Sequence, residues 1–195
     1  MATSRENKTI SMFKSALVGG GARPNLFEVE LTTLPGGITW NAENFRYMCK
    51  AASLPAQNIA AIDVPFRGRI FKVAGDRTID TWTVTIINDE GFALRNAFEE
   101  WTEQIARLSN NLGATDPSEY MVNAKVFQLG RGSTASSKDS TGETNVVLKE
   151  YDFIDIFPTN VSAIDVSYDT GDTIEEFTVE FQVQSISVTG SGEPN

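Results

Sequence analysis

The chain has 195 residues, 41% of them hydrophobic and 10% aromatic, so it is long enough to bury a core as one globular domain. It has no histidine and a single cysteine, Cys49. This excludes an intrachain disulfide, a cysteine-based zinc site and nucleophiles that are activated by histidine. No apolar run reaches the roughly 18 residues that a membrane span needs.

The formal net charge of −10 is concentrated near the C-terminus. Residues 1–149 carry equal numbers of acids and bases, whereas residues 150–195 carry ten acids and neither lysine nor arginine. Two interpretations stay open: a solvated acidic face, or a surface that repels a polyanion or meets a basic patch on a neighbour. A conventional nucleic-acid binder is disfavoured, because DNA binding needs clustered lysine and arginine.

The N-terminal half is predicted to consist mainly of strands. Residues 1–9 are polar, and residues 10–18 predict a short helix or docking segment that ends at a glycine hinge. Alternating apolar and polar residues predict five strands. They span residues 26–31, 45–51, 59–64, 69–73 and 81–87. The third and fourth form a hairpin around residues 66–68, and we expect residues 75–78 to form a tight turn before the fifth.

One strong helix is predicted after these strands. Apolar residues recur at spacings of four and three and form one stripe, which indicates packing against a sheet. They are Leu94, Phe98, Trp101, Ile105 and Leu108. Asn88 or Asp89 is expected to cap the start of this helix, and residues 110–113 to end it.

Strands return in the C-terminal half. They are predicted over residues 124–129, 146–157, 163–168 and 174–188. Pro158 is expected to close the second of them, and residues 130–145 form a flexible excursion rich in serine, threonine and glycine. Eight or nine strands with one helix predict a mainly β fold, an antiparallel β-sandwich or barrel with one flanking α-helix.

The sequence contains no catalytic constellation. Glu175 and Glu176 are adjacent, so they point to opposite faces of a strand. Asp165, Asp169 and Asp172 lack the spacing of a calcium loop, and no serine lies in a nucleophile elbow. We therefore expect no catalytic residue, cofactor or metal.

Several segments resemble one protein family when they are taken together and in order. They are residues 22–27 (ARPNLF), 49–51 with 54–56, 73–78 (VAGDRT) followed by 82–85 and 88–90, and 158–161 (PTNV). Over about residues 22–185 the chain resembles the tail tube proteins of contractile-tailed bacteriophages. The resemblance implies one tail-tube domain over residues 1–195, with an N-terminal arm (1–21), a loop (130–145) and a tail (189–195) at its periphery.

The resemblance implies a structural virion protein of a contractile phage tail. In this family a hexamer forms a ring whose inner sheets join into one β-barrel, and stacked rings form a tube that conducts DNA into the host. The tube protein of type VI secretion shares this architecture. The implied partners are further copies of the chain and the tail sheath, baseplate and tail terminator proteins, with no membrane. DNA would pass through the lumen without specific binding, and assembly would occur in the host cytoplasm.

Two sets of charged residues are candidate sites within this architecture. An acidic lumen would repel DNA phosphates, and its candidates are Asp152, Asp155, Asp165, Glu176 and Glu180. A second set is proposed to bridge subunits or rings by pairing with the acidic C-terminal quarter: Arg67, Arg69, Lys72, Asp76 and Arg77. The alternatives are solvated outer strands for the acids and ordinary surface arginines for the bases.

Other functions stay open from the sequence. Within the same architecture the alternative is a type VI secretion-like or baseplate-proximal tube subunit. From another class it is a carbohydrate-binding β-sandwich module, although the aromatic residues alternate with polar ones as core residues do. A hydrolase with two carboxylates is the enzyme alternative.

Overall fold

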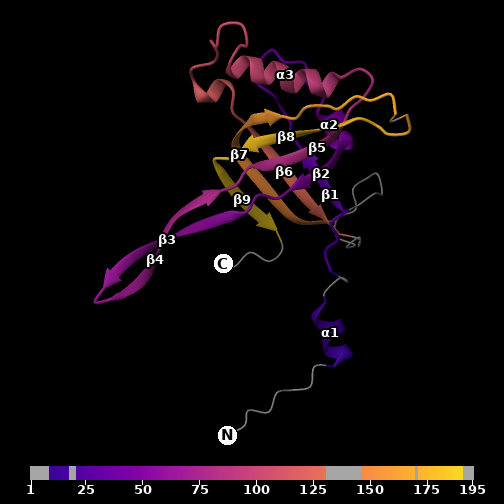
Figure 1. The fold of residues 1–195 in the computed structure, drawn as a ribbon. Helices are drawn as coiled ribbons and strands as arrows, with labels where there is room; N and C mark the ends of the chain where they lie inside the picture. The colour runs from indigo at the N-terminus through magenta and orange to yellow at the C-terminus, as the bar shows by residue number, and fades with distance from the viewer. Residues whose placement is uncertain (1–8, 18–20, 131–145, 170, 191–195) are drawn as a thin grey trace.

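A seven-stranded antiparallel sheet bends at one long strand into two layers, which are the first and second sheets of a β-sandwich (Figure 1). The computed structural model describes residues 9–17, 21–130, 146–169 and 171–190. The first sheet contains β1 (Phe27–Glu30), β6 (Val122–Leu129), the first half of β7 (Val147–Val161) and β9 (Ser185–Gly190). The second sheet contains the second half of β7, β8 (Glu176–Gln182), β5 (Trp82–Ile87) and β2 (Cys49–Ser53). The predicted fold class is confirmed.

Strand β7 changes sheets at a sharp bend. Asp155 has φ +54°, and its N–H donates to the side-chain oxygen of Asn123 at 3.0 Å. This local departure from strand geometry turns the chain from β6 and β9 toward β8. The expectation that Pro158 ends this strand is wrong, because β7 runs on to Val161. Proline is tolerated there because the second half of β7 is the edge of the second sheet.

The core lies between the two sheets and α3 (Ala93–Ile105), which covers one end of the sandwich (Figure 1). Every second residue of β5 and β8 points into this core. These residues are at most 1% exposed: Trp82, Val84, Ile86, Phe177, Val179 and Phe181. Phe98 of α3 is fully buried, with its ring centroid 5.6 Å from that of Trp40 and 6.0 Å from that of Phe181. Leu94, Phe98 and Trp101 of the predicted apolar stripe are therefore core, and the partly buried Ile105 packs against them.

One of the two residues predicted to cap the start of α3 does so, whereas the end of the helix departs from the sequence expectation. Asp89 does accept a hydrogen bond from the N–H of Ala93 at 3.2 Å, but the buried Asn88 donates its amide to Glu175 at 2.8 Å and does not cap the helix. The helix ends at Ile105, earlier than predicted, and Leu108 is 94% exposed. The chain folds back there, because the N–H of Ala114 donates to the carbonyl of Gln104 at 2.9 Å.

The predicted strand over residues 45–51 is mostly wrong. Residues Ala42–Met48 form helix α2, and β2 begins only at Cys49. The side chain of Asn41 accepts from the N–H of Asn44 at 3.1 Å and caps the helix. Phe45 and Cys49 are both buried and lie four residues apart, which is the spacing of one helix face. Because Tyr47 lies between them, the same residues also fit the alternation of a strand.

Strands β3 (Gln57–Phe66) and β4 (Arg69–Ile79) form the predicted hairpin, longer than expected and projecting from the sandwich (Figure 1). The tight turn expected at residues 75–78 is wrong, because these residues belong to β4. They lie where the pairing with β3 shifts register between Ile59 and Ala61. A Cβ on Gly75 would lie 3.1 Å from the carbonyl oxygen of Ala60, so glycine suits this bulge rather than a turn.

The C-terminal hairpin predicted from residues 163–168 and 174–188 is also wrong. The described part of residues 162–175 contains no strand, and the last predicted strand divides into β8 and β9. β9 crosses to the first sheet and pairs with β7.

The predicted N-terminal helix is confirmed as α1 (Ile10–Ala16), and η2 (Pro117–Glu119) is a short 3-10 helix. Residues 1–8, 18–20, 131–145, 170 and 191–195 lie outside the described residues, and they include most of the predicted glycine hinge and most of the predicted excursion.

We predict that Phe98→Ala lowers the free energy of unfolding by about 3–5 kcal/mol, because it leaves a cavity among packed aromatic rings. Urea unfolding of the two proteins measures the difference. Asn96→Ala on the exposed side of α3 is the control and should change stability by less than about 0.5 kcal/mol. Equal losses for both variants would contradict the assignment of Phe98 to the core.

Burial raises the pKa of the Cys49 thiol from 9.0 to about 12. The folded state therefore holds the proton more tightly than the unfolded state. The contribution of this proton to the free energy of unfolding is fully present below pH 9. It is lost as the pH rises toward 12, by up to about 1.4 kcal/mol per pH unit. We predict that the unfolding free energy of the wild type falls more steeply above pH 9 than that of Cys49→Ala. Parallel pH profiles would contradict this.

Candidate assembly surfaces

The β3–β4 hairpin exposes an apolar face that none of the described residues covers. Directly opposed residues share a face of a ribbon, and here they are Ile62 with Val73, Val64 with Phe71, and Phe66 with Arg69. The five apolar members of this set, which we call the hairpin face, are each 42–67% exposed. Exposed apolar surface of this extent is typical of sites that contact another protein.

All five bridging candidates lie on this hairpin, but at different levels. Arg67 in the turn and Arg69 at the start of β4 lie at the tip, and the guanidinium of Arg67 is 5.5 Å from the ring of Phe66. Lys72 lies midway and pairs with Asp63 at 3.0 Å. Asp76 and Arg77 lie toward the base, opposite the start of β3. The tip therefore combines two cations with an exposed aromatic ring.

The structure does not bring the five acidic candidates together. Glu176 and Glu180 lie on the outer side of the second sheet. Asp152 lies on the outer side of the first sheet, where it pairs with Lys125 at 3.1 Å. Asp155 occupies the bend of β7 and Asp165 the connection to β8.

The outer sides of the two sheets differ in how their charges are paired. On the first sheet Lys125 contacts Glu150 at 2.7 Å as well as Asp152, and both carboxylates raise the pKa of its ammonium group. Glu28 of the same sheet pairs with Arg46. Three carboxylates of this surface therefore each have a cationic partner.

The second sheet carries what we call the polar face. Its centre contains Ser53, Thr83, Thr85, Thr178 and Glu180. Glu176 at its margin pairs with Lys50 at 2.5 Å. Among the described residues the carboxylate of Glu180 has no ion pair. The polar face is thus lined by small hydroxyls and one uncompensated negative charge per subunit.

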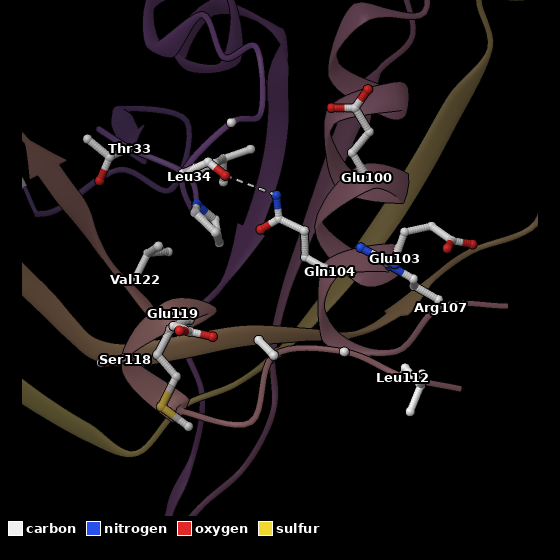
Figure 2. Close-up of a pocket in the computed structure, with 16 residues that line it drawn as sticks. Thr33, Leu34, Glu100, Glu103, Gln104, Arg107, Leu112, Ser118, Glu119 and Val122 are labelled. Carbon is white, nitrogen blue, oxygen red and sulfur yellow. Dashed lines mark hydrogen bonds between the residues drawn. The ribbon is translucent and has the colours of Figure 1, made fainter. Parts of the chain in front are cut away.

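A further surface lies beside the end of α3. The turn at residues 33–37, the last turns of α3 and residues 112–122 enclose an open hollow of about 1170 Å³, which we call the α3 hollow. Figure 2 shows Gln104 reaching across to this turn, where its amide donates to the carbonyl of Gly36 at 3.1 Å. Glu100, Glu103 and Glu119 outnumber Arg107 and make the lining acidic on balance. This surface could not be predicted from the sequence, because its three segments meet only in the folded chain.

The described residues offer neither a metal site nor a membrane span. No group of three or more of their acidic or cysteine side chains could hold a metal ion. None of their helices is both long enough and apolar enough to cross a bilayer.

Comparison with known proteins identifies the family. A family model described as phage tail tube protein matches residues 22–188. The chain belongs to the phage tail tube protein family. It is 37% identical over 161 residues to the tail tube protein gp19 of Enterobacteria phage T4, covering 83% of this chain and 88% of the relative. The corresponding protein of Enterobacteria phage T6 is 36% identical over the same shares.

Solved structures share the fold of this tail tube protein at low sequence identity. A chain of the anti-feeding prophage baseplate superposes with a TM-score of 0.61 and 12% identity, covering 87% of this chain and 96% of that one. A chain of the sheath–tube complex of an extracellular contractile injection system superposes with a TM-score of 0.59 and 11% identity. This match covers 95% of this chain and 100% of that one. The family predicted from the motifs is confirmed. The protein is a structural component of the phage tail and not an enzyme.

Proposed function

We propose that hexameric rings of this chain stack into the inner tube of a contractile tail and that DNA passes through its lumen without specific binding. The observation that carries the proposal is the exposed apolar hairpin, a surface suited to contact between copies of a repeating assembly. Chains of similar fold occur in a baseplate, a sheath–tube complex and a tube-terminating cap. The sheath, baseplate and terminator proteins of the tail are the corresponding partners, and assembly takes place in the host cytoplasm.

The edges of the second sheet favour closure into a ring. Within the described residues β2 pairs only with β5, and the second half of β7 only with β8. Both edges leave unpaired backbone groups, which favour pairing with another strand. Joining β2 of one subunit to β7 of the next makes a continuous barrel and leaves no free edge.

The polar face of the second sheet is the proposed lumen wall. Its threonines present small hydroxyls, and Glu180 adds a negative charge in each subunit. A ring of such carboxylates repels DNA phosphates, the reverse of the counterion release that drives DNA binding. Of the five acidic candidates, this proposal keeps Glu176 and Glu180 in the lumen and places Asp152, Asp155 and Asp165 away from it.

Assembly of the purified protein tests the stacking of rings. We predict that concentrated wild-type protein forms long tubes in negative-stain images, whereas Arg67→Glu/Arg69→Glu remains folded by circular dichroism and does not form them. Reversing the tip charges places like charges at the contact between rings. Normal tubes from this variant would contradict the proposed role of the tip in ring stacking. Isolated rings from the wild type would favour a baseplate-proximal or type VI secretion-like subunit.

Labelling of an introduced cysteine tests the lumen. Because native Cys49 is buried and its thiol pKa is raised, the new cysteine is the reactive one. We predict that Glu180→Cys reacts with a bulky polymer-linked maleimide in dissociated subunits and is protected in tubes. Thr189→Cys, on the exposed outer side of the first sheet, is the matched control and should react in both states. Equal labelling of Glu180→Cys in tubes and subunits would exclude the polar face from the lumen.

A further inference from the structure

We propose that the hairpin tip of each subunit docks into the α3 hollow of a subunit in the adjacent ring. This inference rests on the proposed stacking of rings and assigns the two surfaces that meet. The occupant of the hollow is thus a second copy of this chain, presenting Phe66, Arg67 and Arg69.

The positions of the two surfaces suit a repeating contact. The hairpin leaves the sandwich on the side away from α3 (Figure 1). A strand of ten residues such as β3 spans about 30 Å, so the tip lies well clear of its own body. When identical subunits stack in one orientation, the hairpin side of one ring faces the α3 side of the next. Such a head-to-tail contact repeats without limit along an axis.

The charges of the two surfaces are complementary. Residues 57–79 carry four bases and two acids, whereas residues 93–122 carry five acids and two bases. At the tip, neither Arg67 nor Arg69 has an ion pair with any described residue. In the hollow, the carboxylates of Glu100 and Glu119 likewise have none among the described residues. Both surfaces therefore present charges that are free to pair with each other.

The apolar parts of the two surfaces also match. Phe66 at the tip and Leu112 in the lining are each 65% exposed, so docking would remove both from water. Leu34 and Met121 contribute further apolar lining. The hollow is preformed, because the amide of Gln104 holds the turn at Gly36 (Figure 2). A preformed site loses little conformational entropy when the tip enters.

A charge exchange tests the docking. The tip variant is Arg67→Glu/Arg69→Glu, the hollow variant is Glu100→Arg/Glu119→Arg, and the exchange variant carries all four substitutions. The fraction of protein that sediments as tubes should fall more than about tenfold in the tip and hollow variants. It should return to within about twofold of the wild type in the exchange variant, because every ring contact again joins opposite charges. The control Glu43→Arg/Glu90→Arg makes the same change in net charge outside the hollow and should leave tube formation unchanged.

The outcomes separate this inference from the proposed function. Normal tubes from the hollow variant, or no recovery in a folded exchange variant, overturn the docking. Stacking by the hairpin still stands in that case if the tip variant alone is defective. Normal tubes from the tip variant overturn the docking and the role of the hairpin tip in stacking, whereas the proposed tube itself still stands.

A cross-link decides the matter even if the exchange variant fails to fold. Arg69→Cys/Glu119→Cys tubes should give a ladder of covalent multimers on oxidation, whereas either single variant should give none. Absence of the ladder in well-formed tubes overturns the docking. A hollow variant that forms normal tubes but no longer binds the sheath would show that the sheath, and not a second copy, occupies the hollow.

Discussion

The alternation of β5 and β8 is the constraint on which the rest of the structure depends. Every second residue of these paired strands enters one aromatic core, where Trp82 lies between Phe153 and Phe181 at ring distances of 4.7 and 5.1 Å. Because the side-chain period of a strand is two, burial of these residues places the intervening residues on the opposite side of the sheet. The burial of Phe181 and the exposure of Glu180 to the proposed lumen therefore both follow from the same strand register. A register slip by one residue would destroy the core and the polar face together.

The sequence predicts the elements whose pattern reflects a local rule. The strand Trp82–Ile87 and the stripe of α3 follow from periodicity, since their buried faces meet a single large core. The hairpin was also predictable, because apolar runs flank Arg67-Gly68. Gly68 has φ +83°, a conformation that glycine adopts without strain.

The errors arise where long-range pairing overrides the local signal. Pro158 looks like a terminator, but it lies at the edge of a sheet, where the missing N–H is not needed. Residues 75–78 look like a turn, but pairing with β3 keeps them extended around a bulge. Phe45 alternates with Tyr47 as in a strand, yet packing against Phe98 at 6.1 Å selects a helix. The candidate sites follow the same division: their residues could be named from the sequence, but which of them share a surface depends on the tertiary fold.

The proposed contact also explains how an exposed hairpin can be tolerated before assembly. A long apolar ribbon is a template for unwanted association, and charged residues at its end are a common protection. Here the tips of identical hairpins carry Arg67 and Arg69 and repel one another, whereas a hollow lined by Glu100 and Glu119 attracts them. The same two arginines would thus oppose pairing between hairpins and favour the head-to-tail contact. On this view tube polarity follows from charge placement: the tip fits only a surface on the far side of an identical subunit, so every ring added must face the same way.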